Sequence, residues 1–351
     1  MTNVQALPLE IRNLSRKIGS QQILSNIGLD LAAGELLCLV GQSGCGKSTL
    51  LRLIAGVDTP DAGVIQLGER VVAGPSAFVE PEQRGVGLMF QDYALFPHMT
   101  VAQNVAFGLR GRPRAAIRQK VEETLARLDI GHFATRYPHM LSGGEQQRVA
   151  LARAIAPGPG ILLMDEPFSN LDSRLRETVR AETIGLLRQL GTTTILVTHD
   201  PQEALMFADR VALMREGRIV QTGTGRQLYN QPQDPFVARF FSDFNEMRGV
   251  CRSGHVPTPF GLVPAGDSAR EGDEMLVLIR PGALQPNPQG RSGQAQIVHR
   301  QFCGDVEQLA LKVEGHPDIV TIRSQASEQF GIGSFIRLDI NNQGAFVFPI
   351  N

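Results

Sequence analysis

A glycine-rich segment carries the clearest chemical signal in the sequence. It reads Gly41-Gln42-Ser43-Gly44-Cys45-Gly46-Lys47-Ser48-Thr49 and fits the pattern G-x-x-x-x-G-K-[ST]. Glycines allow backbone N–H groups to turn inward around phosphate oxygens, and a helix that starts here adds the positive end of its dipole. Lys47 could then reach the β- and γ-phosphates of a nucleotide, and the hydroxyl of Ser48 could bind Mg²⁺. An ordinary glycine-rich turn is the alternative.

Two adjacent carboxylates, Asp165 and Glu166, follow the apolar run 161–164. If this run is a buried strand, both acids lie at the carboxyl edge of a sheet, where a phosphate-binding loop also sits. Asp165 could hold Mg²⁺ through water, and Glu166 could act as a base toward the attacking water. A pair of solvated acids that ends a strand is the alternative.

Two further polar residues follow apolar runs. His199 comes after residues 194–198, and Gln91 comes after residues 87–90. A lone histidine in such a place is usually structural. The strand before His199 would be the third to end on the same side as Lys47. His199 could therefore donate a hydrogen bond to a γ-phosphate. Gln91 could bind Mg²⁺ or water, although a single glutamine says little.

The segment Leu141-Ser142-Gly143-Gly144-Glu145 predicts a second anion-binding helix start. Ser142 is a suitable N-cap, and the two glycines expose backbone N–H groups at the positive end of a helix. One chain does not need two such starts for one triphosphate, whereas two chains that face each other would use both. A plain helix cap is the alternative.

Strands that alternate with helices indicate an α/β fold with a mostly parallel sheet covered on both faces. We expect strands at residues 9–14, 22–31, 36–40, 161–164 and 193–197. We expect helices at residues 47–55, within 112–130, at 146–156, after Asp172 and from Pro201 onward. Residues 56–110 stand out only as rich in turn residues.

The pattern changes between residues 230 and 250. Proline and glycine cluster over residues 249–266, and short apolar runs separated by turn signals follow. These runs are residues 275–279, 309–313, 319–322, 335–340 and 346–349. They predict a small all-β domain, either a barrel or a sandwich.

Composition excludes several classes of protein. The chain has 351 residues, a hydrophobic fraction of 42% and a net charge of −1, so neither global disorder nor a basic nucleic-acid-binding face is expected. No apolar run approaches the roughly 18 residues of a membrane helix, and the first residues do not resemble a secretory signal. The four cysteines lack zinc-site spacing. We expect a soluble cytoplasmic chain that does not bind nucleic acid.

Together these segments resemble the ATPase subunit of an ATP-binding cassette (ABC) transporter over residues 4–240. In order they are residues 41–49, Gln91, the signature segment 141–145, residues 161–166, the D-loop Ser169-Asn170-Leu171-Asp172, and His199. The C-terminal part is similar to the accessory domain of binding-protein-dependent importers. Its tripeptide Ile279-Arg280-Pro281 resembles a motif that recurs in that group. The implied fold is a P-loop ABC ATPase domain over residues 1–240, followed by a small all-β, OB-like (TOBE-type) domain over residues 245–351. The first domain would combine a parallel-sheet core with antiparallel strands and a helical subdomain.

The resemblance also implies the site and the partners. A head-to-tail homodimer would bind two ATP molecules with Mg²⁺ at its interface. Within one chain, residues 41–49 would bind ATP, Ser48, Gln91 and Asp165 would hold the metal, and Lys47, Gln91, Glu166 and His199 would serve catalysis. The second chain would add Ser142, Gly143, Gly144 and Asp172. Two permease subunits would dock near Gln91, and a solute-binding protein would act indirectly. The chain would then be a peripheral protein on the cytoplasmic face of the cell membrane.

Two positions depart from the family pattern. The family usually stacks adenine on an aromatic side chain, and the matching position here is Ile18, which offers burial without ring stacking. Residues 236–247 also differ in sequence from the family pattern. We interpret their phenylalanines as side chains that pack within a linker.

The transported solute does not touch this subunit in the family mechanism. The sequence of residues 90–100 and the compact β domain are most similar to those of ferric iron importers. Polyamine, thiamine, sulfate and sugar importers share much of this sequence. A non-transport ABC ATPase acting on nucleic acid or ribosomes is an alternative, as is another P-loop enzyme such as a kinase or GTPase.

Overall fold

The computed structural model describes residues 5–266, 269–287, 293–325 and 331–350, with only the backbone described for residues 173–175. The chain forms two compact units, Met1–Arg226 and Gln227–Asn351. Among the described residues, no helix is both long enough and apolar enough to cross a membrane.

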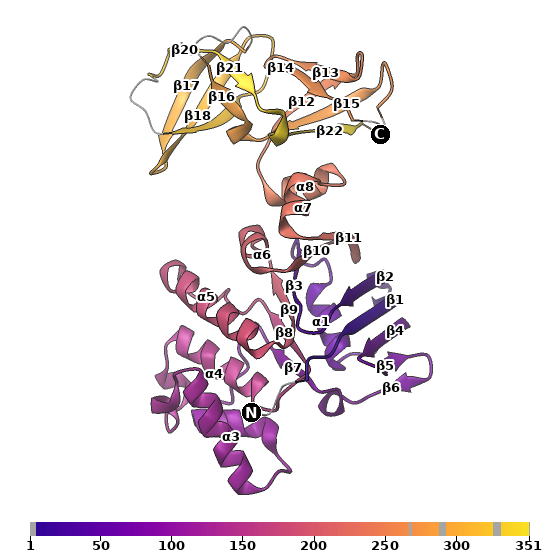
Figure 1. The fold of residues 1–351 in the computed structure, drawn as a ribbon, viewed down its shortest axis with the longest axis vertical. Coiled ribbons are helices and arrows are strands. Elements are labelled where there is room, and N and C mark those ends of the chain that lie inside the picture. The colour runs from indigo at the N-terminus through magenta and orange to yellow at the C-terminus, as the bar shows by residue number, and fades with distance from the viewer. Residues whose placement is uncertain (1–4, 267–268, 288–292, 326–330, 351) are drawn as a thin grey trace. The chain divides into compact units, whose positions relative to one another are not determined.

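A mostly parallel sheet forms the centre of the first unit (Figure 1), with the strand order β11-β10-β3-β9-β8-β7. Its strands are β3 (Leu36–Gly41), β7 (Val86–Met89), β8 (Ile161–Asp165), β9 (Thr193–Thr198), β10 (Arg210–Arg215) and β11 (Arg218–Gly223). All neighbours are parallel except β10 and β11. Strands β3 and β9 are buried along their whole length, which explains why they read as continuous apolar runs.

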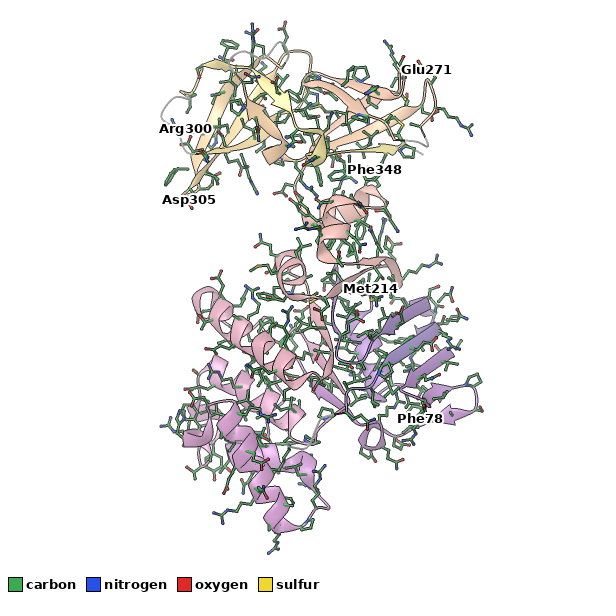
Figure 2. The ribbon with its side chains drawn as sticks, viewed as in Figure 1. Phe78, Met214, Glu271, Arg300, Asp305 and Phe348 are labelled. Carbon is green, nitrogen blue, oxygen red and sulfur yellow. The ribbon has the colours of Figure 1, made fainter. Side chains whose placement is uncertain are left out.

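A second, antiparallel sheet has the strand order β2-β1-β4-β5-β6. Its strands are β1 (Leu9–Ile18), β2 (Gln21–Leu31), β4 (Ala62–Leu67), β5 (Arg70–Gly74) and β6 (Ala77–Phe78). Helix α1 (Lys47–Ala55) packs its leucines against both sheets in one buried cluster, which also includes Met214 at the end of β10 (Figure 2). Strands β4 to β7 lie in the region that the sequence indicated only as turn-rich. They were not predicted because they are short and most have glycines in or next to them.

Helices of the first unit are α2 (Val101–Ala106), α3 (Arg114–Arg127), α4 (Gly143–Ile155), α5 (Ser173–Leu190) and α6 (Pro201–Phe207). Helices α2, α3 and α4 contact one another and form the helical subdomain expected from the sequence. The prediction that helix α4 starts at Gln146 is wrong. It starts at Gly143, because Ser142 and Glu145 form a capping box.

The second unit is a β domain with two preceding helices, α7 (Gly225–Asn230), which spans the division between the units, and α8 (Pro235–Phe241). Its sheets have the orders β12-β15-β22, β13-β14, β16-β21 and β19-β18-β17-β20. The strands are β12 (Asn245–Val250), β13 (His255–Thr258), β14 (Gly261–Pro264), β15 (Glu274–Ile279), β16 (Leu284–Pro286), β17 (Ala295–Phe302), β18 (Val306–Val313), β19 (Val320–Gln325), β20 (Phe335–Ile336), β21 (Leu338–Ile340) and β22 (Ala345–Pro349).

One strand of this unit differs from the prediction made from the sequence. The run 335–340 is not one strand, because β20 pairs with β17 whereas β21 pairs with β16. The second compact unit begins at Gln227, and within it Ala238 of α8 is buried against Leu278 and Phe348 of the β domain. The segment 236–247 therefore forms α8 and the start of β12.

Candidate functional site

The parallel strands of the central sheet bring the predicted site segments to one edge. Because β3, β7, β8 and β9 run in the same direction, their carboxyl ends lie side by side. The residue pairs at this edge are Val40 with Thr198, Asp165 with Val197, and Met89 with Met164. Each of the segments that contain Lys47, Gln91, Glu166 and His199 leaves the sheet from this edge.

The phosphate-binding loop connects β3 to α1 and depends on glycine. Gly46 has φ +105°, and a Cβ there would lie 2.6 Å from Leu24, so a larger residue would be strained and would clash. Lys47 is buried, and its Nζ donates to the carbonyl oxygens of Gly41 at 2.8 Å and Gln42 at 3.0 Å. The ammonium is therefore held at the loop, where a phosphate oxygen can compete for it.

Side chains of this loop divide into a buried part and an exposed tip. Cys45 is buried, with its Sγ 3.9 Å from Nζ of Lys47. Four residues are exposed at the tip and the helix start, namely Gln42, Ser43, Gly44 and Ser48, and Thr49 is half-buried. The exposed part can receive a ligand, whereas Cys45 packs into the core beneath it.

Ser48 and Asp165 provide the oxygen ligands that Mg²⁺ prefers. The Ser48 hydroxyl, at the start of α1, is close enough to the Asp165 carboxylate at the end of β8 to lower the pKa of that carboxyl. Burial raises the pKa of Asp165 above its usual range, and the neighbouring charge of Glu166 adds to the rise, while Ser48 and Lys47 oppose it. Serine hydroxyl and carboxylate oxygens fit a magnesium ion that also binds substrate phosphates and water.

Glu166 links three strand ends through one carboxylate oxygen. Its Oε2 accepts a hydrogen bond from Nε2 of Gln91 at 3.4 Å and lies 3.1 Å from Nδ1 of His199. Glu166 has a left-handed backbone, with φ +44°, and its side chain is 21% exposed. A carboxylate that is oriented on both sides and still reaches solvent is suited to activate a water molecule.

The residues predicted to act from the second chain lie at the start of α4 and beside it. Ser142 caps its own helix, since its Oγ accepts from the Glu145 N–H at 3.5 Å and its own N–H donates to Glu145 at 2.7 Å. A Cβ on Gly143 would lie 3.6 Å from Leu171 of the D-loop. The structure thus places Ser142, Gly143, Gly144 and the Asp172 segment near one another, at a helix N-terminus able to attract an anion.

Ile18 is the predicted adenine contact, and it lies at the end of β1 opposite Gln21, in the β1–β2 hairpin. Its side chain is 57% exposed. It therefore offers an aliphatic surface to a base but no ring.

Sequence reasoning missed the side chains that fasten this site together. The Asn170 amide donates to the carbonyl oxygen of Gln91 at 2.9 Å, and the Ser169 hydroxyl donates to that of Glu166 at 2.9 Å. The guanidinium of Arg153 donates to the carbonyl oxygens of Tyr93 and Ala94, which follow Gln91 in the chain. The available signal for Arg153 was a lone cation within the otherwise apolar end of its helix.

Family models match both parts of the chain. Residues 24–169 match the model described as ABC transporter, and residues 277–348 match the model described as TOBE domain. The first match covers most of the site segments, and the second lies within the β domain.

Curated relatives match most of the chain. The sulfate/thiosulfate import ATP-binding protein CysA 2 of Chromobacterium violaceum is 42% identical over 89% of this chain and 86% of its own length. The Fe(3+) ions import ATP-binding protein FbpC of Mesorhizobium japonicum is 39% identical over 97% of this chain and 99% of its own. The spermidine/putrescine import ATP-binding protein PotA of Marinobacter nauticus is 46% identical over 89% of this chain and 86% of its own.

Proposed function

Because the chain belongs to the family of ABC importer ATP-binding subunits, which use ATP with Mg²⁺, we propose that its homodimer hydrolyses ATP to drive ferric iron uptake through a membrane permease. The observation that carries the ATPase proposal is the shared Oε2 of Glu166, which meets both Gln91 and His199 next to the Ser48–Asp165 pair. These groups lie at the sheet edge to which the phosphate-binding loop leads.

The chemistry follows from what each side chain can do. Lys47 exchanges its loop carbonyls for the β- and γ-phosphates, and its charge offsets the charge that develops on them. Ser48 and Asp165 hold Mg²⁺, which neutralises phosphate charge when bound. Glu166 takes a proton from the attacking water, while His199 and Gln91 orient the carboxylate and the γ-phosphate.

A second copy of the chain would complete each site. The first turn of α4 presents Ser142, Gly143 and Gly144 at a positive helix end, next to the D-loop. In a head-to-tail homodimer these groups and Asp172 would face the γ-phosphate held by the other chain. ATP would then close the dimer, and hydrolysis would reopen it.

Ferric iron is the solute that we propose. The Mesorhizobium japonicum relative named for Fe(3+) ions aligns over 97% of this chain and 99% of its own length, and so extends through the β domain. Two permease subunits and a solute-binding protein would be its partners. We expect the chain to act as a peripheral subunit on the cytoplasmic face of the cell membrane, because ATP is supplied from that side.

Uptake in cells tests this proposal. Cells that lack the protein are complemented with wild type or with Glu166→Gln, and uptake of labelled ferric iron is measured in a strain without another iron importer. Rescue by wild type alone supports both the solute and its dependence on ATP hydrolysis. Normal iron uptake without the protein rejects iron, and a panel of polyamine, thiamine, sulfate and sugar then replaces it.

A further inference from the structure

The turn that carries Gln91 has an unusual backbone. Tyr93 and Ala94 have φ values of +62° and +45°, a left-handed conformation that non-glycine residues rarely adopt. Two such residues in succession persist only when neighbouring groups hold them. The turn follows β7 and precedes α2, so whatever holds it also determines where the Gln91 side chain points.

Arg153, near the C-terminus of α4, binds both strained residues. Its Nη1 donates to the carbonyl oxygen of Ala94 at 2.6 Å, and its Nη2 donates to that of Tyr93 at 2.8 Å. The guanidinium lies 5.3 Å from the centre of the Phe96 ring. Burial lowers the pKa of Arg153, which reflects how far these contacts replace water. The planar fork of arginine suits two successive carbonyls, which a single ammonium cannot match.

Other side chains attach the same segment to the site. Asn170 of the D-loop binds the carbonyl oxygen of Gln91 at 2.9 Å, and the Tyr93 hydroxyl donates to that of Pro167 at 3.5 Å. Asn104 of α2, fully buried, binds backbone groups of residues 96, 99 and 100. The attachment made by Arg153 differs from these because it comes from α4, the helix that Ser142 caps.

We propose that Arg153 is a positioning residue for hydrolysis, which ties α4 to the turn that aims Gln91 at Glu166. From Ser142 to Arg153 a continuous helix spans about 16 Å at 1.5 Å per residue. A displacement of its N-terminal end would therefore move the carbonyl clamp at its other end as one body. This inference rests on the proposed function, in which that N-terminal end meets the nucleotide of a second chain.

The test compares Arg153→Ala and Arg153→Lys with Arg148→Ala in the purified full-length chain. Arg148 is a matched control, since it lies on the same helix and its carboxylate partner is Glu182 of α5. Hydrogen exchange is measured over residues 90–100 and, for comparison, over residues 43–56. ATP hydrolysis is measured as kcat and KM.

For Arg153→Ala we expect amide exchange over residues 90–100 to be about tenfold faster or more, with residues 43–56 unchanged. We expect kcat to fall about 10- to 100-fold with little change in KM, because the phosphate-binding loop is intact. Arg153→Lys should be intermediate in both, which keeps the test informative if the alanine variant folds poorly. Arg148→Ala should leave exchange over residues 90–100 at the wild-type rate.

Wild-type exchange over residues 90–100 in both Arg153 variants would overturn the proposal. So would an equal increase in Arg148→Ala, which would reveal a general loosening of α4. The exchange measurement does not require turnover, so a chain that fails to hydrolyse ATP contradicts the proposed function without deciding this inference.

Discussion

The imidazole Nδ1 of His199 lies 3.1 Å from the carboxylate Oε2 of Glu166, and the same oxygen accepts a hydrogen bond from Gln91. Two oriented partners restrict the rotation of the carboxylate and leave its other oxygen for water. His199 is more exposed than Glu166, at 62% against 21% for the side chains, so a substrate can reach the histidine first. Whether Nδ1 of His199 donates a proton in this contact depends on the tautomer of the ring.

Glu166→Gln should keep ATP binding and lose hydrolysis by about 10²- to 10⁴-fold, because the amide keeps the shape but is not a base. With saturating Mg·ATP the variant should accumulate as a closed dimer in light scattering. Glu216→Gln is a control, since Glu216 also has a left-handed backbone but is exposed outside the site. A Glu166→Gln chain that hydrolyses ATP at the wild-type rate would remove Glu166 from the chemistry.

Lys47→Ala should weaken Mg·ATP binding by more than about tenfold, because it removes the ammonium that is held at the phosphate-binding loop by Gly41 and Gln42. Equilibrium binding of a fluorescent ATP analogue measures the change. Lys312→Ala, an exposed lysine of the β domain, should bind like wild type. Unchanged affinity in Lys47→Ala would mean that loop N–H groups alone bind the triphosphate.

Asp165→Asn should change how stability depends on pH in the nucleotide-free chain. The pKa of Asp165 is raised by burial, so the folded chain binds this proton more tightly than the unfolded chain. The free energy of unfolding therefore falls as pH rises from the usual value of about 3.9 through the raised pKa. Asp165→Asn should remove this decrease, so that it is more stable than wild type at neutral pH but not at low pH.

Urea denaturation without Mg²⁺ at successive pH values measures this difference. Asp129→Asn, at an exposed position, is the control and should follow the wild-type pH profile. Identical pH profiles for Asp165→Asn and wild type would show that Asp165 keeps its ordinary pKa.

Much of the site edge could be predicted from sequence because its signals are local. Each of Gly41, Asp165 and His199 follows a buried apolar strand, and parallel strands must end at one edge. The roles of these residues stay predictions. The clamp made by Arg153 could not be predicted, because it joins carbonyl oxygens 59 and 60 positions away, and backbone carbonyls have no sequence identity.

The missed strands have physical causes as well. Strand β17 contains a register shift between Ile297 and His299, which breaks the alternation that marks a half-buried strand. Strands β4 and β5 are short, and the turn Gly68-Glu69 separates them. The burial of β4 depends on its pairing with β1, which lies far away in the sequence.

Ser142→Arg should abolish hydrolysis while ATP binding persists, because the serine that would meet the nucleotide of the other chain is lost. The change also removes an N-cap worth about 0.5–2 kcal/mol. Thr100→Arg removes the matching capping box of α2 and serves as the control for this loss. Mixing inactive Ser142→Arg with inactive Lys47→Ala should restore activity, since one site of each mixed dimer has both an intact loop and an intact serine. No restoration would contradict composite sites.

Breaking the buried ion pair between Arg180 and Glu203 should destabilise the segment that carries His199. Nη1 of Arg180 lies 2.9 Å from Oε1 of Glu203, whose Oε2 accepts from the Thr198 hydroxyl at 2.6 Å. The side chains of the pair are 10% and 5% exposed, so Arg180→Met would leave a buried carboxylate without its cation. We expect a loss of about 3–5 kcal/mol in the free energy of unfolding, measured by urea denaturation.

The double variant Arg180→Met with Glu203→Leu should recover much of that loss, because no charge then stays buried and unpaired. The exposed pair Arg118–Glu122, with side chains 84% and 65% exposed, provides the control. Arg118→Ala should leave the free energy of unfolding close to that of wild type, because the pair is screened by solvent. If Arg180→Met were as mild as Arg118→Ala, water would have to reach Glu203, and the ion pair would then not fix Thr198 beside His199.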